Sequence, residues 1–476
     1  MNCIPFSKFY SLLHTLFVLL LVFTFQCCKK DPGIAIPTIE NSEELSGGDF
    51  TTFDVSPQAY GNAGLSLDGI GLDKFAVGNS FFRNNWVAAP SSTVARDGIG
   101  PMLNALSCSG CHFNDGRGRP PLNPGEKLSS MLIRLSTSAV ESHGAPVGLI
   151  EYGEQLNNKS IPGATAEGDV LVNYIENLGK YDDGAEYSLR NPTYNFINLA
   201  YGAFPSDFLF SPRVAPQMPG LGLLEAIDEK SILANADPND SNKDGISGRP
   251  NIVWDNEKNQ NALGRFGWKA NQPSISQQTA AAFVGDMGIT SSLFPLEHLG
   301  KKQHLLYDSL PKGGKPEIEK NILDNVIFYS STLSVPARRN WTEKQVVNGK
   351  SLFMKTGCGN CHIPSFVTGV HSFINELSNQ KIMPYTDLLL HDMGPELADG
   401  RKDFEANGNE WRTPPLWGLG LLKKVSNHTF LLHDGRARNF EEAILWHGGE
   451  AIEAQKSFKK LDKLEREAMI KFIESL

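Results

Sequence analysis

Two short motifs place two cysteines and a histidine close together in the sequence. They read Cys108-Ser-Gly-Cys111-His112 and Cys358-Gly-Asn-Cys361-His362. At this C-x-x-C-H spacing each thiol can form a thioether to a haem vinyl group, and the adjacent imidazole is placed to bind the iron. Histidine accounts for 11 of 476 residues, so its position directly after both cysteine pairs is improbable by chance. The motifs therefore predict two covalently bound haem c groups.

The same cysteine pairs have two other interpretations. Four cysteines can bind a structural zinc ion, and each C-x-x-C pair can form a disulfide. The remaining three of the seven cysteines, Cys3, Cys27 and Cys28, lie near the N-terminus, so the rest of the chain has no further thiol for a disulfide. Haem c is attached outside the cytoplasm, and the haem interpretation therefore requires an export signal.

Residues 1–28 have the features of such a signal. Lys8 gives a weakly positive start, and residues 16–25 form an apolar run of signal-peptide length that is short for a membrane span. The Cys27-Cys28 pair resembles a bacterial lipoprotein cleavage site, which predicts a periplasmic or cell-envelope protein tethered to the membrane through lipidated Cys28. A secreted form and an uncleaved anchor are the alternatives. Residues 29–65, rich in Pro, Gly, Ser and Thr, are expected to be a linker.

From about residue 66 the chain contains an internal duplication. Gly78-Asn-Ser-Phe-Phe82 precedes the first motif, and Gly349-Lys-Ser-Leu-Phe353 precedes the second. The following features also match in order: Arg190 with Arg412, Arg213 with Arg436, and residues 223–227 with 440–444. A planar, permanently charged guanidinium suits a haem propionate, so these arginines are candidate cofactor contacts, with ordinary surface or capping use as the alternative. We expect an N-terminal haem domain with a large insertion over residues 66–335 and a C-terminal haem domain over residues 336–476.

Helices carry most of the secondary structure that the sequence predicts. Apolar residues at helical spacing predict helices over residues 279–284, 316–329, 440–446 and 457–475, whereas strand signals are sparse. Much of the remaining chain is rich in Gly, Pro and Asn, as expected where a large prosthetic group replaces part of the core. We therefore predict a mainly α fold with long loops.

One acidic loop is a candidate calcium site, and the net charge of the chain limits the classes of partner. Asp240, Asn242 and Asp244 follow the D-x-N-x-D-G pattern of a calcium loop. Asn251 stands where an EF-hand has its bidentate Glu, so a plain Asn/Asp/Gly turn is the alternative to one calcium ion. The formal net charge of −9 argues against nucleic-acid binding and fits a small-molecule substrate or a basic redox partner.

Longer stretches around these motifs resemble a known family. They are CSGCHFNDGRGRPP, LGLLEAID, DGISGRPN, LGRFGWKA, DMGITSSLFPLE, YTDLLLHDMG, EWRTPPLWGLGL and FLLHDGRARNFEEAILWHGGEA. Over nearly the whole mature chain they are similar to bacterial di-haem oxidoreductases of the peroxidase type, and more distantly to the di-haem cytochrome c peroxidases and the methylamine-utilisation di-haem enzyme. The resemblance implies two cytochrome c-like domains, in which one haem reacts with peroxide and the other relays electrons.

The resemblance also assigns iron ligands. It implies that His112 and His362 are the proximal ligands of the two haems. It places the sixth ligand of the second haem at His447, with Met393 and His391 as competing ligands and a hydrogen bond in the core as the alternative role of His447. Coordination by two histidines lowers the reduction potential relative to a His/Met pair.

At the N-terminal haem an open iron position and an acid–base group are expected. Glu225 is the leading candidate and Glu229 the second, although both can be solvated helical carboxylates; Arg213 is the candidate arginine of the catalytic site. The relatives carry a tryptophan between the haems where this chain has Phe210. Electron hopping would then pass to another tryptophan, for which Trp254, Trp268, Trp417 and Trp446 are available.

The sequence therefore predicts a di-haem c-type peroxidase. Hydrogen peroxide would be reduced at the N-terminal haem, with electrons from an external donor such as a small redox protein relayed by the C-terminal haem. Oxidation of an organic or protein substrate is a variant of this hypothesis. The rival is a non-catalytic electron-transfer cytochrome, for which Met218, His143 and Met287 are available as a second ligand of the first iron.

Overall fold

Helices and short strands alternate along the chain in the computed structural model, which describes residues 42–476. The predicted signal segment, with Cys3, Cys27 and Cys28, lies outside the described residues. The described residues all belong to one compact unit. Within the described range, no helix combines the length and the apolar character that crossing a membrane requires.

The elements have the following bounds. The α-helices are α2 (Gly69–Arg83), α3 (Leu221–Glu225), α4 (Glu229–Leu233), α5 (Ile275–Met287), α6 (Lys301–Tyr307), α7 (Lys320–Thr332), α8 (Lys344–Lys355), α9 (Leu422–Ser426), α10 (Phe440–Leu445), α11 (Ile452–Lys460) and α12 (Lys463–Ser475). The strands are β1 (Thr51–Thr52), β2 (Met102–Leu103), β3 (Met131–Ser136), β4 (Lys159–Ser160), β5 (Asp169–Lys180), β6 (Glu186–Ile197), β7 (Leu209–Val214), β8 (Ile252–Asp255), β9 (Gln260–Leu263), β10 (Val335–Pro336), β11 (Phe366–Val367), β12 (Lys381–Ile382), β13 (Leu390–Asp392) and β14 (Glu410–Arg412). Single 3₁₀ turns include η3 (Cys108–Gly110) and η5 (Cys358–Asn360), which carry the first three residues of the two motifs.

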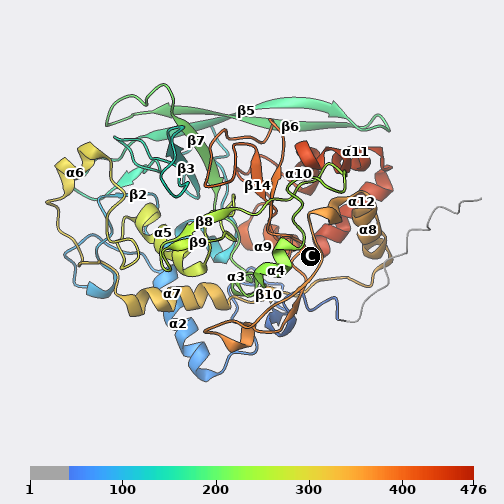
Figure 1. Ribbon diagram of the computed structural model, residues 1–476, viewed down its shortest axis with the longest axis horizontal. Helices are drawn as coiled ribbons and strands as arrows, with labels where there is room; N and C mark the ends of the chain where they lie inside the picture. The colour runs from blue at the N-terminus through green and yellow to red at the C-terminus, as the bar shows by residue number, and fades with distance from the viewer. Residues whose placement is uncertain (1–41) are drawn as a thin grey trace, which may run out of the picture. The chain divides into compact units, whose positions relative to one another are not determined.

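Two pairs of helices repeat the same crossing. Helix α2 packs against α7, and α8 packs against α12 (Figure 1). Gly78 of α2 lies against the backbone of Asn325, and Gly349 of α8 lies against the backbone of Ala468, so closely that a methyl group at either glycine would overlap the facing carbonyl oxygen. Glycine at these two positions therefore lets each pair of helices approach, and the duplicated sequence corresponds to a duplicated helix contact.

Each helix pair also positions its motif through a phenylalanine near the end of the first helix. The ring of Phe82 lies 5.1 Å from that of Tyr329 and 6.3 Å from the imidazole of His112. In the second pair, the Phe353 ring lies 5.1 Å from that of Phe472 on α12 and 6.1 Å from the imidazole of His362. The same aromatic contact thus supports both motif histidines.

The predicted mainly α class of two cytochrome c-like domains is wrong. Helices make up 29% and strands 18% of the structure, which is a mixed α/β fold with small sheets. Every sheet of the described residues has two strands, and the longest is the antiparallel ribbon of β5 and β6, paired from Asp169 with Ile197 to Lys180 with Glu186. A two-stranded ribbon buries few positions, so its apolar alternation is weak, and the other strands are too short to give a periodic signal.

The β5–β6 ribbon runs along one edge of the described unit, from the region of β3 and β7 to that of α10 and α11 (Figure 1). Arg190 of β6 donates hydrogen bonds to the carbonyls of Arg436 (2.8 Å) and Gly435 (3.0 Å). At the turn that closes the ribbon, the Tyr181 hydroxyl donates to Glu441 of α10 at 2.7 Å. The ribbon therefore joins the first half of the chain to the second.

The four predicted helices are confirmed, with one change. Residues 279–284, 316–329 and 440–446 fall within or overlap α5, α7 and α10. The range 457–475 is divided between α11 and α12, because Asp462 caps α12 in a reciprocal capping box with Glu465 and so starts a new helix.

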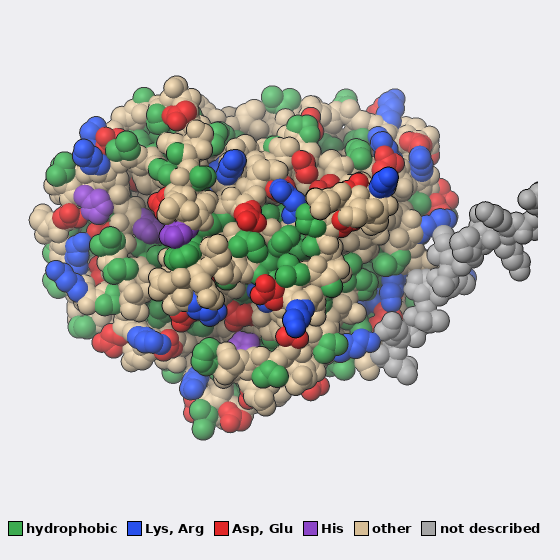
Figure 2. Space-filling view, in the orientation of Figure 1, with side chains coloured by type: hydrophobic (Ala, Val, Ile, Leu, Met, Phe, Trp, Pro, Cys, Tyr) green, Lys and Arg blue, Asp and Glu red, His purple; other side chains and the backbone are tan. Residues whose placement is uncertain are grey.

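Residues 42–65, part of the range assigned to a linker, pack against the rest of the described chain. Strand β1 pairs in parallel with β10, and Phe50 and Tyr60 are completely buried. The predicted domain boundary after Val335 falls inside β10. On the face shown in Figure 2, basic and acidic side chains are interspersed.

Candidate cofactor site

The imidazoles of the two motif histidines are held in the same way. His112 Nδ1 donates a hydrogen bond of 2.8 Å to the carbonyl of Pro216, and His362 Nδ1 donates one of 2.9 Å to the carbonyl of Tyr385. A carbonyl only accepts, so this bond fixes the tautomer and leaves the Nε2 lone pair free for a metal. Burial lowers the pKa of both imidazoles to about 4, which keeps them neutral and able to coordinate iron.

A cavity of about 330 Å³ opens next to the second motif. Its wall combines the motif with apolar side chains and a few polar groups, including Cys358, Cys361, His362, His391, Met393, Arg412, Leu416, Leu419, Leu431, Phe440, Ile444 and His447. An apolar cavity with two thiols and an imidazole on its wall has the donor set and the surroundings that a covalently attached haem requires.

His447 lies on the wall of this cavity, just after α10. Its Nδ1 donates a hydrogen bond of 2.7 Å to the carbonyl of Ala443, which again leaves Nε2 free. Burial lowers the pKa of His447, and His447 is one of the groups that lower the pKa of His362. The two neutral imidazoles therefore lie in the same part of the cavity. The thioether of Met393 also lines it.

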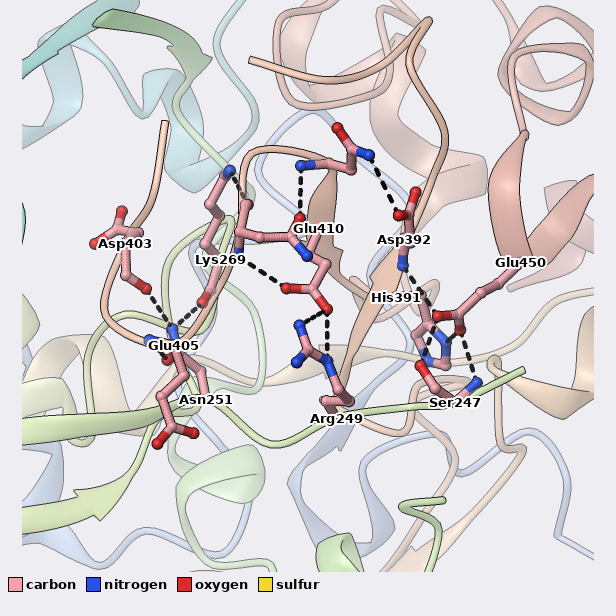
Figure 3. A network of polar contacts seen from close by, with 12 residues as sticks. Ser247, Arg249, Asn251, Lys269, His391, Asp392, Asp403, Glu405, Glu410 and Glu450 are labelled. Atoms are coloured by element: carbon pink, nitrogen blue, oxygen red, sulfur yellow. Dashed lines mark hydrogen bonds and ion pairs between the residues drawn. The ribbon is translucent and has the colours of Figure 1, made fainter. Parts of the chain in front are cut away.

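His391, the other competing ligand, is occupied on both ring nitrogens. Its Nε2 lies 2.8 Å from Asp387 Oδ2. Its Nδ1 lies 2.8 Å from Glu450 Oε2, a contact that Figure 3 shows. Burial disfavours the charged imidazole, but the hydrogen bonds to Asp387, Cys361 and Glu450 outweigh it and hold the pKa of His391 well above its ordinary value. A doubly protonated imidazole has no lone pair for iron.

The carboxylate of Glu450 links this histidine to the loop that contains the predicted calcium residues. It accepts hydrogen bonds from the Ser247 hydroxyl (2.6 Å) and backbone N–H (3.0 Å), as Figure 3 shows. Burial raises the pKa of Glu450, but the bonds from His391 and Ser247 prevail and lower it to about 2. In the described part of the chain, one group of three metal-binding side chains has its ligand atoms within 4.8 Å of one another: Cys361, Asp387 and His391.

Arg412 is the predicted propionate partner that lines the cavity. Its Nε donates to the carbonyl of Gly267 at 2.9 Å, whereas its Nη1 is buried without a hydrogen-bond partner. Arg117, from the first half of the chain, also reaches this wall and has a buried Nε without a partner. Burial lowers the pKa of both guanidinium groups to about 10. Unpartnered N–H donors on the wall of an apolar cavity fit the carboxylates of a haem.

The other three predicted arginines have protein partners. Arg190 bonds to backbone carbonyls of the second half through the ribbon. Arg436 forms an ion pair of 2.9 Å with Asp434, and Arg213 forms a buried one of 2.9 Å with Asp403. None of these three lines the cavity around the second motif.

The two candidate catalytic glutamates lie apart from this cavity. Glu225, at the end of α3, accepts a hydrogen bond from the Ile275 backbone N–H at 2.7 Å and lies 3.4 Å from His371 Nε2. Glu229 is exposed at the start of α4. No role was predicted for Asp286, although it begins the stretch DMGITSSLFPLE quoted above, nor for Gln155, which hydrogen-bonds to it at 2.9 Å.

The acidic loop forms a set of local turns. Asp240 accepts from the Gly245 backbone at 3.2 Å, and Asp244 accepts from that of Ile246 at 2.9 Å. Asn242 donates to the Asp244 carboxylate at 3.1 Å. Asn242 and Asp244 are exposed and Asp240 is half-buried, and side-chain oxygens of all three already accept backbone N–H groups. Calcium binding at this loop stays a prediction.

Several cavity-lining residues were not identified from the sequence. They are Arg117, Gln217, Trp411 and His433, and they line the cavity together with Trp268, one of the predicted electron-hopping candidates. The Arg117 guanidinium lies 4.8 Å from the centre of the Trp268 ring, and the rings of Trp411 and His433 stack at 3.8 Å. The only available signal was the position of Arg117 five residues after His112, inside a stretch already recognised as similar to the family.

The zinc and disulfide interpretations have no geometric support in the described residues. All four motif cysteines are free there, and no group of three or more metal-binding side chains combines cysteines of both motifs. The described chain instead offers two separate C-x-x-C-H sites.

Comparisons with known proteins agree with the motifs. A search of proteins of curated function found no significant match. Among solved structures, a hydrazine synthase from Kuenenia stuttgartiensis, studied under xenon pressure, matches 84% of this chain and 92% of its own at 13% identity, but its TM-score of 0.30 is too low to support an argument. The family described as "Di-haem oxidoreductase, putative peroxidase" has a sequence profile that matches residues 41–476. The chain therefore belongs to this di-haem oxidoreductase family.

Proposed function

We propose that the protein is a c-type di-haem peroxidase in which the second haem relays electrons to the first, where hydrogen peroxide is reduced. The overall reaction is H₂O₂ + 2H⁺ + 2e⁻ giving two water molecules, with both electrons supplied by an external reduced donor such as a small redox protein. Each haem, when bound, supplies an iron that changes its charge by one electron at a time.

The asymmetry between the two motifs is the observation that carries this proposal. The cavity of the second motif contains two neutral histidines with free Nε2 atoms, His362 and His447, which suits a relay iron that needs no open position. Around His112 the expected alternative ligands are engaged elsewhere. His143 is exposed and stacks on Trp254 at 3.8 Å.

The two candidate methionine ligands of the first iron lie in the hydrophobic core. Met218 and Met287 lie in an apolar cluster together with Phe82 and Trp86. Thioethers in such a cluster are ordinary core side chains. This arrangement favours an enzyme with one open iron over an electron carrier with two closed ones.

Covalent attachment belongs to the proposal as well. Each thiol of Cys108, Cys111, Cys358 and Cys361 would add its S–H across one vinyl double bond, so that no atom is lost. The mass of the denatured protein should then exceed that of the polypeptide by two haems. A protein that releases its haem on denaturation would contradict thioether attachment. Labelling with a radioactive fatty acid, compared with Cys28→Ala, tests the proposed lipoprotein form at the cell envelope.

Peroxide-dependent oxidation of a reduced small cytochrome c by the holoprotein tests the catalytic proposal. We expect turnover in the half-reduced protein, its loss in His112→Ala, and normal turnover in the control His143→Ala, which changes an exposed histidine of the same half. Two low-spin haems that ignore cyanide in both the ferric and the half-reduced protein, without turnover, would overturn the proposal in favour of an electron carrier.

A further inference from the structure

At Gly285, near the C-terminal end of α5, the missing side chain leaves a methyl-sized space between polar groups. Gly285 is buried there, and a methyl group on it would lie 3.8 Å from Arg134 Nη1 and 4.0 Å from Gln155 Oε1. Apart from its own helix and chain neighbours, no other atom of the described residues would come within 4 Å. The glycine therefore leaves room in front of a guanidinium and an amide.

Strand pairing brings Arg134 and Gln155 together. The two residues are antiparallel bridge partners, with Leu156 N–H donating to the Ile133 carbonyl at 2.9 Å next to them. Directly opposed residues in an antiparallel pair project to the same face of the sheet. Gln155 then reaches α5, because its Nε2 donates to Asp286 Oδ1 at 2.9 Å. Arg134, Gln155 and Asp286 thus surround one space.

These three side chains have unused polar atoms. Within residues 42–476, the Arg134 guanidinium makes no hydrogen bond or ion pair, and only one carboxylate oxygen of Asp286 has a hydrogen-bond partner. Both residues are half-buried, and Gln155 Oε1 is fully buried without a partner. Burial raises the pKa of Asp286 above its ordinary value, while Arg134 and Gln155 act in the opposite direction. Leaving such groups unpaired inside a protein is costly, so the space is suited to a small polar ligand.

The space lies next to the first haem motif. The carbonyl of Asp286 accepts hydrogen bonds from the backbone N–H groups of Asn104 (2.8 Å) and Ala105 (3.1 Å), and Ala105 packs against Cys111. The negative charge of Asp286 also adds to the effect of burial in raising the pKa of Cys108 and Cys111 to about 12. The carboxylate therefore lies within the electrostatic range of both attachment thiols.

Contacts between elements place the end of α5 beside the first motif. Helix α5 packs against α7 and against β2, the strand that leads into the motif. Residues two apart on a helix point about 200° apart, so Met287, which is 2% exposed in the apolar cluster, projects away from the side on which Gly285 opens.

We propose that Arg134, Gln155 and Asp286 form the peroxide-binding pocket of the first haem, with Asp286 as its acid–base group in place of Glu225. This inference rests on the proposed peroxidase function. Asp286 would take the proton from the nearer peroxide oxygen and deliver it to the farther one as the O–O bond breaks, and Arg134 would stabilise the negative charge that develops on the leaving oxygen. The carboxyl ends unchanged, and the two electrons and two further protons of the overall reaction come from the donor and from solvent.

Fluoride binding to the ferric holoprotein tests the pocket without turnover. Fluoride is an anion that accepts hydrogen bonds, so the loss of the guanidinium in Arg134→Leu should raise its dissociation constant at least about tenfold. Gly285→Ala should fold with normal thermal stability, because its methyl meets nothing closer than 3.8 Å, yet bind fluoride more weakly. Arg119→Leu, which removes a half-buried arginine paired with Glu126, is the matched control and should leave fluoride binding unchanged.

Peroxide kinetics test the acid–base group. Asp286→Asn keeps the acceptor for Gln155 and should slow the reaction with peroxide by about 100-fold or more. Glu225→Gln should not, and neither should Glu167→Gln, a buried carboxyl of the same half whose pKa burial raises to about 8.

Four outcomes would overturn the pocket assignment. The first is unchanged fluoride affinity in Arg134→Leu with altered haem content, which would make Arg134 a propionate partner. The second is normal peroxide kinetics in Asp286→Asn. The third is loss of peroxide reactivity in Glu225→Gln. The fourth concerns His298, whose pKa is lowered by burial and by the nearby positive charge of Arg134. A low-spin first haem that becomes high-spin in His298→Ala would make this histidine a ligand. A wild-type protein that binds fluoride but never turns over peroxide would instead contradict the proposed peroxidase function, while the assignment of the anion-binding pocket would still hold.

Discussion

His447 Nδ1 donates its hydrogen bond to the carbonyl of Ala443, 2.7 Å away and four residues earlier. The acceptor is a carbonyl of the last turn of α10, which has no backbone donor within the helix. The His447 side chain therefore caps the C-terminal end of α10. Because the hydrogen-bond acceptor is a backbone carbonyl, the same bond also fixes the direction of Nε2.

Replacing His447 with Ala should convert the second haem from low spin to high spin and make it accessible to cyanide. The reason is that both nitrogens of His391 face carboxylates, and the ring of His433, which also lines the cavity, stacks on Trp411 at 3.8 Å. Electron paramagnetic resonance of the ferric protein measures the change. An unaltered low-spin signal would transfer the sixth position to Met393.

The close contact between the helices of each pair predicts that a methyl group added at the contact lowers stability. Gly78→Ala and Gly349→Ala should each lower the free energy of unfolding by about 1–3 kcal/mol, because a methyl group overlaps the facing carbonyl and forces the helices apart. Chemical denaturation monitored by circular dichroism measures the loss. Gly69→Ala, on the same α2 helix with nothing within 4 Å, is the control and should be neutral or slightly stabilising. Equal losses at all three positions would argue against crowding as the cause.

Acid should destabilise the protein through Glu450. Its pKa is about 2 in the folded chain against an ordinary value of 4.5, so its contribution is complete above about pH 4.5 and disappears as the pH falls to about 2. A shift of this size corresponds to about 3 kcal/mol. Unfolding measured between pH 7 and 2 should show a shallower acid slope for Glu450→Gln than for the wild type. The exposed Glu453, replaced by Gln, serves as the control, and parallel slopes in Glu450→Gln and wild type would disprove the linkage.

Arg412 should influence the redox equilibrium of the second haem. Its guanidinium is buried on the cavity wall with one N–H unpartnered, and a nearby positive charge favours the reduced iron. Arg412→Leu should therefore lower the reduction potential of this haem, as measured by spectroelectrochemical titration. Arg119→Leu removes the same charge elsewhere and should leave the potential unchanged. A potential that does not move in Arg412→Leu would show that this arginine contacts neither the haem nor its propionates.

Local sequence patterns were sufficient to predict part of this structure. The C-x-x-C-H spacing identifies both motifs because all three groups lie within one turn of chain, and the helical spacing of Phe472 and its neighbours predicts α12. Non-local pairing accounts for what was missed. The bridge between Arg134 and Gln155 and the bond from Gln155 to Asp286 join three separate segments, and no spacing in the sequence encodes their meeting. The ribbon escaped prediction because its strands are half-exposed on both faces, which removes the alternation that marks a buried strand.

The β5–β6 ribbon limits how freely the duplicated halves can diverge. It is inserted in the first half, yet Arg190 bonds to the carbonyls of Gly435 and Arg436, and the Asp183 carboxylate at its tip pairs with Arg466 of α12 at 2.8 Å. Each of these contacts joins a group of the first half to a group of the second, so a chimera that exchanges one half alone has to supply matching partners at the same positions along the ribbon. The ribbon in this way ties the two similar halves into one compact unit.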